Sequence, residues 1–208
     1  MVKGQVGLVE QEKKRDRNDF TLTLILSIIV GITLIFFIVF QYFVFLVTID
    51  GSSMENTLQN GETLIASRYA DIDRGDIVVI EKQKVEKEQT INYLVIKRVI
   101  GIAGDVVRIN SDEGCVYLKK AGENTFVKLD EPYIKQPNST RIEGQSQVDF
   151  TVREGEIFYL GDNRRPSMDS RSDGCCSTEK VMGVVKNWAV SIKGFTTKVF
   201  SNVSQKTS

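Results

Sequence analysis

The sequence has 208 residues, enough for one ordinary domain with a hydrophobic core, so neither disulfides nor metals are needed to explain folding. Its 27 basic and 27 acidic side chains give a formal net charge of zero, which offers no electrostatic argument for nucleic acid as a partner. The absence of histidine excludes a Ser-His-Asp triad and removes the commonest zinc ligand.

The first predicted element is an apolar helix over residues 21–40, which contain no charged side chain. Twenty residues at a rise of about 1.5 Å span about 30 Å, the thickness of the hydrocarbon core of a bilayer. We therefore expect a transmembrane helix after a short N-terminal segment, residues 1–20. A cleavable signal peptide is the alternative, but its apolar run is typically about 7–15 residues. A signal anchor and a long signal peptide remain hard to separate.

Basic residues predict the direction of this helix in the cell membrane. They precede the apolar run, and the next Lys or Arg in the chain is Arg68. This asymmetry predicts a cytoplasmic N-terminus and an extracytoplasmic location for the residues after 50. The basic residues before the helix are Lys3, Lys13, Lys14, Arg15 and Arg17.

After the helix, short runs rich in Val, Ile, Tyr and Phe alternate with Gly, Asp and Asn clusters, a pattern typical of strands and turns. We expect a mostly β domain over residues 41–192, with a polar, loop-rich insertion at about 110–147 and a C-terminal tail at 193–208. The predicted strands are residues 42–49, 62–67, 76–81, 92–101, 105–110, 115–118, 149–152, 157–160 and 181–192.

The three cysteines do not resemble a metal site. Cys115, Cys175 and Cys176 form neither a CxxC pair nor a four-ligand set. Adjacent cysteines can pair with each other only in a strained geometry. A bridge from Cys115 to one of the other two and three free thiols both remain open.

Residues 49–62, IDGSSMENTLQNGE, contain a candidate nucleophile, Ser53, in a turn between two predicted strands. By itself this signal is weak, because most serine-rich turns satisfy their own backbone groups.

A candidate base lies in residues 93–105, YLVIKRVIGIAGD. On a strand, Lys97 shares a face with Val95 and Val99, while Arg98 points the other way. Burial among apolar neighbours lowers the pKa of a lysine, and a neutral amine can accept a proton from a serine. The alternative is an edge-strand lysine that extends to solvent. Because histidine is absent, Lys97 is the best available partner for Ser53.

Residues 159–174, YLGDNRRPSMDSRSDG, are too polar for a simple strand and predict a structured loop. Ser167 could orient the lysine amine, and Asp169 could pair with Arg171 to hold the loop. A solvated surface turn is the alternative.

The segments SMENTL, RGDIVV, KRVIGIAGD and GDNRRPSMDSR resemble, in this order, the four boxes of bacterial signal peptidase I in its Gram-positive-like form with a single anchor. The similarity extends over most of residues 20–185. It implies a β-barrel or β-sheet catalytic domain with one N-terminal transmembrane helix. It also implies a membrane-bound serine endopeptidase that removes signal peptides from secreted preproteins after small-x-small sites such as Ala-x-Ala.

The resemblance also assigns roles to individual residues. It implies that Ser53 is the nucleophile and Lys97 the general base, with Ser167 positioning the lysine. Asp169 and Arg171 match the pair that holds the loop, and Met54 matches a residue of the substrate pocket. No cofactor or metal is implied.

Three positions depart from the family pattern. Asn56 replaces the usual proline, and Cys175-Cys176 replace a Val-Pro pair. Some relatives complete the oxyanion hole with a serine where this chain has Gly51. We therefore expect the backbone N–H of Ser53 to be the principal oxyanion donor, with Ser52 or water as further candidates.

Signal peptides and the lipid bilayer are the implied partners, secretion machinery is a further candidate, and nucleic acid is not expected. Two other functions are compatible with such a domain. One is a non-catalytic, signal-peptidase-like assembly factor for secreted or pilin subunits, which would have no use for a Ser/Lys pair. The other is a self-cleaving repressor protease, which the apolar helix and the lack of a DNA-binding module disfavour.

Overall fold

The computed structural model describes residues 2–86 and 89–204, and it describes side chains for residues 19–86 and 89–198. The chain forms two compact units, Met1–Phe43 and Val44–Ser208, which are described separately here. The side chains of Lys3, Lys13, Lys14, Arg15 and Arg17, on which the predicted orientation depends, lie outside the described residues.

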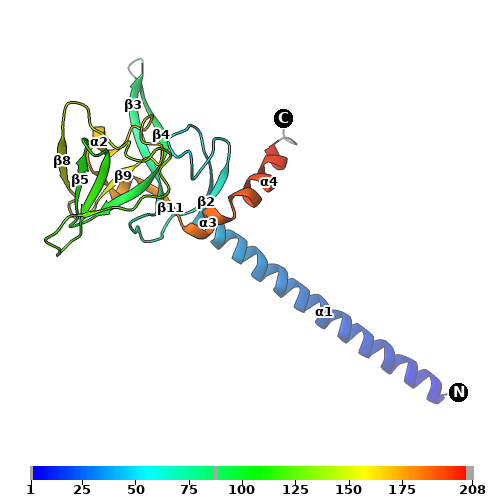
Figure 1. Ribbon diagram of the computed structural model, residues 1–208. Coiled ribbons are helices and arrows are strands. Elements are labelled where there is room, and N and C mark those ends of the chain that lie inside the picture. The colour runs from blue at the N-terminus through cyan, green and yellow to red at the C-terminus, as the bar shows by residue number, and fades with distance from the viewer. Residues whose placement is uncertain (1, 87–88, 205–208) are drawn as a thin grey trace. The chain divides into compact units, whose positions relative to one another are not determined.

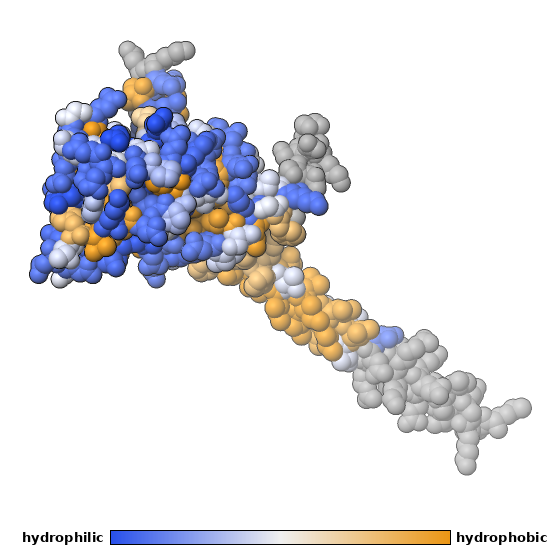
Figure 2. All heavy atoms as spheres, viewed as in Figure 1, coloured by the Kyte–Doolittle hydropathy of each residue, from blue (hydrophilic) through white to orange (hydrophobic). Residues whose placement is uncertain are grey.

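The first unit is one helix, α1, Val2–Phe43. Its part Asp19–Phe43 is long and apolar enough to cross a membrane, and none of it is buried within the protein. Most of the described side chains are apolar, and they form the orange stretch in Figure 2. A helix whose described side chains are mostly apolar and exposed has no core of its own to bury them in, as expected for a membrane-spanning helix.

The second unit is mostly β structure, as predicted (Figure 1). Its larger sheet has seven strands in the order β1-β2-β11-β3-β4-β9-β10. A smaller sheet has four strands in the order β7-β6-β5-β8. The strands are β1 Val44–Thr48, β2 Thr63–Ser67, β3 Ile77–Glu86, β4 Gln89–Ile102, β5 Val106–Asn110, β6 Cys115–Lys119, β7 Val127–Lys128, β8 Gln147–Thr151, β9 Glu156–Leu160, β10 Cys176–Ser177 and β11 Val181–Val185.

Three clusters of buried apolar side chains stabilise this unit. The first includes Val47, Met54 and Ile96 and lies between β1, β2, β4 and the turn after β1. The second joins the two sheets, with Val107 of β5 packed in the same cluster as Phe158 of β9. The third is built from β3, β4, β9 and β11. Because the turn after β1 contributes to the first core, packing fixes its position as well as that of the strands.

Each predicted strand overlaps an observed one, but one prediction was too long. We expected residues 181–192 to be a strand, whereas β11 ends at Val185 and a short helix, α3 Asn187–Ser191, follows. Period-two alternation fails there, because Ala189 and Val190 both pack in the first core. The remaining helices are α2 Ser170–Asp173, the 3₁₀ helix η1 Thr178–Lys180 and α4 Lys193–Ser204, the last in the segment expected to be a tail.

Candidate active site

Ser53 lies in a compact turn that joins β1 to β2. Backbone hydrogen bonds from Ile49 to Glu62 and from Gly61 to Ile49, each 2.9 Å long, close the base of this turn. Within it, the N–H of Leu58 donates to the carbonyl of Met54 at 2.9 Å, so that residues 54–58 form one helical turn. Met54 and Leu58 are buried, which anchors the segment directly after Ser53 in the first core.

Lys97 lies on β4, where it pairs with Val78 of β3, and its side chain is 4% exposed. Val95 and Val99, the residues predicted to share its face, both pack in the third core with Val78. Burial disfavours the ammonium form and lowers the pKa of Lys97 from 10.5 to about 8, although the Asp169 carboxylate acts in the opposite direction.

The two predicted catalytic side chains meet. The Lys97 Nζ donates to the Ser53 Oγ at 2.7 Å, and it donates a second hydrogen bond to the carbonyl of Ile96 at 3.0 Å. The amine and the hydroxyl belong to different elements, 44 positions apart in the chain. An amine with a lowered pKa at this distance is placed to take the hydroxyl proton.

Ser167 does not reach the lysine amine within hydrogen-bond distance. Among the described residues its Oγ is buried without a hydrogen-bond partner. The hydroxyl lies against Gly161 instead, because a Cβ added to Gly161 would come within 2.3 Å of it. The same added Cβ would be 2.6 Å from the Ser53 carbonyl oxygen, so Ser167, Gly161 and the nucleophile turn are closely packed. The predicted lysine-orienting role of Ser167 therefore stays a prediction.

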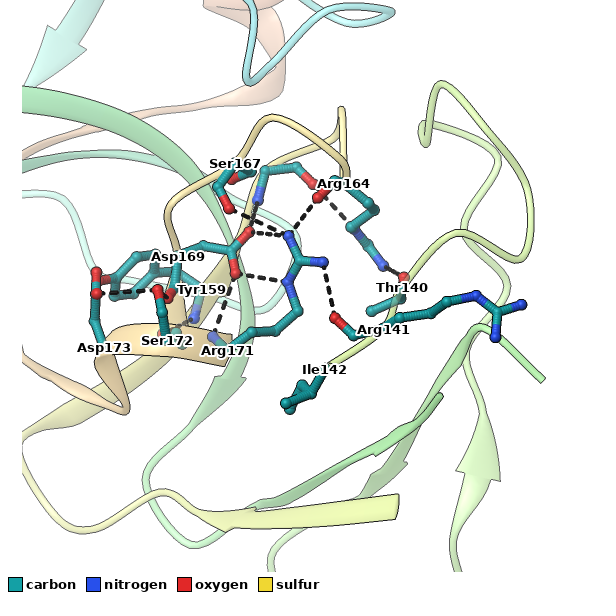
Figure 3. A network of polar contacts seen from close by, with 12 residues as sticks. Thr140, Arg141, Ile142, Tyr159, Arg164, Ser167, Asp169, Arg171, Ser172 and Asp173 are labelled. Atoms are coloured by element: carbon teal, nitrogen blue, oxygen red, sulfur yellow. Dashed lines mark hydrogen bonds and ion pairs between the residues drawn. The ribbon is translucent and has the colours of Figure 1, made fainter. Parts of the chain in front are cut away.

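Asp169 and Arg171 form the predicted ion pair, with 2.8 Å between Arg171 Nε and Asp169 Oδ1 (Figure 3). Arg171 also donates to the carbonyls of Arg164, Ser167 and Arg141. Asp169 is fully buried and accepts a hydrogen bond from the Gly161 N–H at 3.1 Å. These contacts hold both ends of residues 161–171 together, which is the structured loop that the sequence predicted.

The groups proposed for the oxyanion hole have different environments. Gly51 has φ +106°, and its N–H donates to Asn60 Oδ1 at 2.9 Å, so this donor is already engaged. The carbonyls of Ser52 and Ser53 accept hydrogen bonds from Asn163, from its Nδ2 at 3.0 Å and its backbone N–H at 2.9 Å. The backbone N–H of Ser53 has no protein acceptor among the described residues. It is therefore a free donor at the proposed nucleophile.

A cleft of about 330 Å³ adjoins the dyad. Strand β1 and residues that follow it form one wall, and residues 94–97 of β4 form the other. Met54 lies at its base, 2% exposed, where it belongs to both the cleft lining and the first core. Two strand edges that face one cleft suit an extended peptide.

A buried charge network beside the dyad was missed in the sequence. Arg98 donates to Asp162 through Nε at 2.8 Å and Nη2 at 2.6 Å, and Thr57 Oγ1 donates to the same carboxylate at 2.5 Å. Asp162 belongs to the predicted polar loop, residues 159–174, in which the sequence did not single it out. The signal that could have found it is Arg98 itself, because an arginine inside an apolar strand needs a carboxylate partner.

Two departures from the family pattern now have a structural description. Asn56 has φ +99°, a region closed to proline, and its Nδ2 donates to the carbonyl of Tyr133 at 3.0 Å. All three cysteines are free. Cys175 packs beside the second core and Cys176 beside the third, so the adjacent thiols point to opposite sides.

The chain is similar to known proteins in its sequence. The family model described as signal peptidase, peptidase S26, matches residues 22–189. A signal peptidase I of Bacillus caldolyticus is 31% identical over 191 residues, covering 86% of this chain and 92% of that protein. A signal peptidase IB of Staphylococcus aureus is 33% identical over 178 residues, covering 77% of this chain and 85% of that protein. A solved structure of a signal peptidase I from Enterococcus faecalis V583 is 26% identical in sequence, with a TM-score of 0.41. The match covers 56% of this chain and 98% of that chain.

The matched residues include most of the apolar helix, the nucleophile turn, the strand that carries Lys97 and the loop that carries Asp169. Since the family model covers well over half of the sequence, the chain belongs to the signal peptidase family, peptidase S26, and is an enzyme of the signal peptidase I type.

Proposed function

We propose that this enzyme removes signal peptides by a Ser53/Lys97 acyl-enzyme mechanism, with the β-rich unit on the extracytoplasmic side of the cell membrane. The observation that supports it most directly is the 2.7 Å contact between Lys97 Nζ and Ser53 Oγ in a buried environment. In the proposed cycle, neutral Lys97 takes the Ser53 proton while Oγ bonds to the scissile carbonyl carbon. The resulting ammonium then donates that proton to the leaving amine.

The second half of the cycle repeats these roles with water. Lys97, neutral again, takes a proton from a water molecule whose oxygen attacks the acyl carbon, and the released Ser53 oxygen recovers the proton. The free backbone N–H of Ser53 would donate to the oxyanion in both halves. This assignment leaves Gly51 as a conformational residue, since its own N–H is engaged with Asn60.

The substrate would bind in the cleft between β1 and residues 94–97 as an extended segment. Because Met54 and Ile96 already fill the first core, the pocket beside Ser53 is floored by fixed side chains. A pocket with such a floor accepts small side chains and excludes large ones, which agrees with cleavage after small-x-small sequences.

Ser53→Ala and Lys97→Ala each test the proposal in a reconstituted assay with the full chain and a preprotein that carries an Ala-x-Ala site. We expect each variant to lose processing by at least about a thousandfold, since removing a nucleophile or its base disables the step that both must perform. Wild-type enzyme should show kcat/KM that rises with pH and levels off above about 8, because Lys97 must be neutral. Near-normal turnover in Lys97→Ala would refute the dyad, and binding of preprotein without cleavage by the wild type would favour an assembly factor.

A further inference from the structure

Residues 131–135, part of the polar insertion, contact both loops that surround the catalytic pair. They follow β7 and lie outside both sheets. No sequence motif assigns them a role. They contact the nucleophile turn on one side and the loop that begins at Gly161 on the other.

The first contact is a buried ion pair. Arg164 is fully buried, and its Nη1 lies 3.2 Å from Glu131 Oε2, while the Glu131 side chain is 6% exposed. Arg164 also donates to the carbonyl of Gly161 at 2.9 Å and to the hydroxyl of Thr140 (Figure 3). Because a buried guanidinium needs a counter-charge, Glu131 fixes the position of Arg164 and, through it, of Gly161.

The second contact is made by the Tyr133 ring. The Arg98 guanidinium lies 4.1 Å from the centre of that ring, and the Tyr133 hydroxyl donates to Glu131 Oε1 at 2.9 Å. Arg98 in turn holds Asp162, which accepts a hydrogen bond from Thr57 of the nucleophile turn. The ring therefore covers the charged group that links Lys97's own strand to the turn behind Ser53.

The backbone of the same residues makes direct contacts as well. The carbonyl of Tyr133 accepts the hydrogen bond from Asn56 Nδ2 at 3.0 Å. The N–H of Lys135 donates to the carbonyl of Asp162 at 3.0 Å, and its side chain forms an ion pair with Glu55. Glu55 and Asn56 are the second and third residues after Ser53, so the nucleophile turn is held from outside at these positions.

We infer that residues 131–135 act as a brace that positions Ser53 against Lys97, with Glu131 and Tyr133 as its positioning residues. The inference rests on the proposed Ser/Lys mechanism and names further residues on which that mechanism depends. Since none of the hydrogen bonds, ion pairs and ring contacts described above for the brace reaches β1 or residues 94–97, its loss should misplace the reacting groups and leave substrate binding intact. Misplacement by about 1 Å can lower turnover about a hundredfold.

Tyr133→Leu and Tyr133→Phe, made in the full chain in detergent micelles, separate the ring contact from the hydroxyl contact. We expect Tyr133→Leu to lower kcat about tenfold to a hundredfold with KM within about twofold of wild type. Tyr133→Phe keeps the ring over Arg98 and should stay within about threefold in kcat. Tyr117→Leu is the matched control, because Tyr117 lies in β6 of the same insertion and its hydroxyl donates, among the described residues, a hydrogen bond to Glu113 alone. Equal losses in the two Tyr133 variants, or a loss confined to KM, would overturn the inference.

Hydrogen exchange tests the brace without any cleavage. In wild type, the N–H groups of Leu58 and Asn163 are bonded to the carbonyls of Met54 and Ser53. Tyr133→Leu should speed exchange at these two amides and leave the β3–β4 pairing protected, whereas Tyr117→Leu should change neither.

If Tyr133→Leu destabilises the whole β-rich unit, Glu131→Gln tests the brace instead, because it keeps the shape of the side chain and removes its charge. It should raise the rate of amide exchange at residues 54–58 and 163 and lower kcat, as expected for Tyr133→Leu. Unchanged exchange there would overturn the brace. If wild type failed to cleave any preprotein, the proposed function would fail, while the exchange measurements would still support or refute the brace.

Discussion

Lys97 shows at the scale of one residue how this site couples reactivity to stability. A lysine that is 4% exposed and whose pKa is lowered to about 8 must lose its proton or remain as a buried cation when the unit folds. The lowering of the Lys97 pKa from 10.5 to about 8 corresponds to about 3 kcal/mol by which burial disfavours the charged form of the side chain relative to the neutral form. The same burial favours a neutral amine beside Ser53, so the loss of stability and the proposed basicity of Lys97 have one cause.

The first prediction follows from this coupling. Lys97→Met should abolish cleavage and raise the free energy of unfolding by about 2 to 3 kcal/mol at pH 7, since an apolar side chain of similar length avoids the penalty. The pKa of Lys97 is lower in the folded state, so the wild-type penalty is complete below about pH 8 and disappears as the pH rises towards 10.5. The gain from the substitution should therefore shrink between pH 8 and 10.5.

Chemical denaturation at pH 7 and at pH 10 measures this gain. Lys120→Met provides the control, because Lys120 is exposed and its replacement should change stability by less than about 0.5 kcal/mol at either pH. An equal gain at both pH values would show that burial of the charge is not its source.

At the scale of elements, the proposed catalytic pair is in contact with a loop that contains neither residue. Residues 161–171 carry the Gly161 N–H that binds Asp169 and the Asn163 N–H that binds the Ser53 carbonyl. Gly161 lies where this loop passes the nucleophile turn, with the Ser53 carbonyl and the Ser167 hydroxyl both in the space that a Cβ would occupy. The close approach explains why this position is glycine.

The second prediction concerns this approach. Gly161→Ala should push the nucleophile turn away and lower kcat about tenfold to a hundredfold, because the added carbon would lie 2.6 Å from the Ser53 carbonyl oxygen. Steady-state kinetics on a signal-peptide substrate measure the loss. Gly194→Ala in α4 is the matched control, since nothing lies within 4 Å of its added Cβ. Full activity in Gly161→Ala would contradict the close packing of the loop against the turn.

The elements also show what a sequence can predict. Lys97 and the loop of Asp169 could be predicted because each departs from its local background, a lysine in an apolar strand and a dense polar run. Ser53, a serine in a turn, is only a weak signal by itself and could be predicted only together with Lys97 and the family resemblance. Residues 131–135 have no such local signal, because a Glu and a Tyr on either side of a proline are ordinary in a surface loop. Their role depends on partners such as Arg98 and Arg164 that come together only in the fold.

The lengths of β3 and β4 were underestimated for a similar reason. The outer half of the β3–β4 hairpin, with Gln83 paired to Asn92 and Lys84 to Ile91, is exposed. Its register is set by the buried pairs at its base, such as Val78 with Lys97, and not by its own side chains. The extension of a strand beyond its buried part is a tertiary property that alternating hydrophobicity does not reveal.

At the scale of the whole molecule, the chain combines a membrane-spanning helix with a β-rich unit that has cores of its own. The three apolar clusters draw on residues from Phe45 to Val190, and none includes a described residue of α1. The unit Val44–Ser208 therefore contains these clusters as well as the proposed catalytic pair. We propose that α1 contributes to catalysis by keeping enzyme and membrane-bound substrate on one surface.

The third prediction separates these two contributions. A variant that lacks residues 1–43 should keep the thermal unfolding transition of the β-rich unit and cleave a short soluble peptide with kcat within about threefold of the full chain, because the dyad and its cleft are intact. With a preprotein anchored in vesicles, its rate at equal enzyme concentration should fall by about a hundredfold or more, since confinement to one bilayer no longer raises the effective concentration. An unrelated apolar helix of the same length in place of α1 should restore that rate if tethering is the cause, whereas failure of this replacement would mean that the α1 sequence itself recognises the substrate.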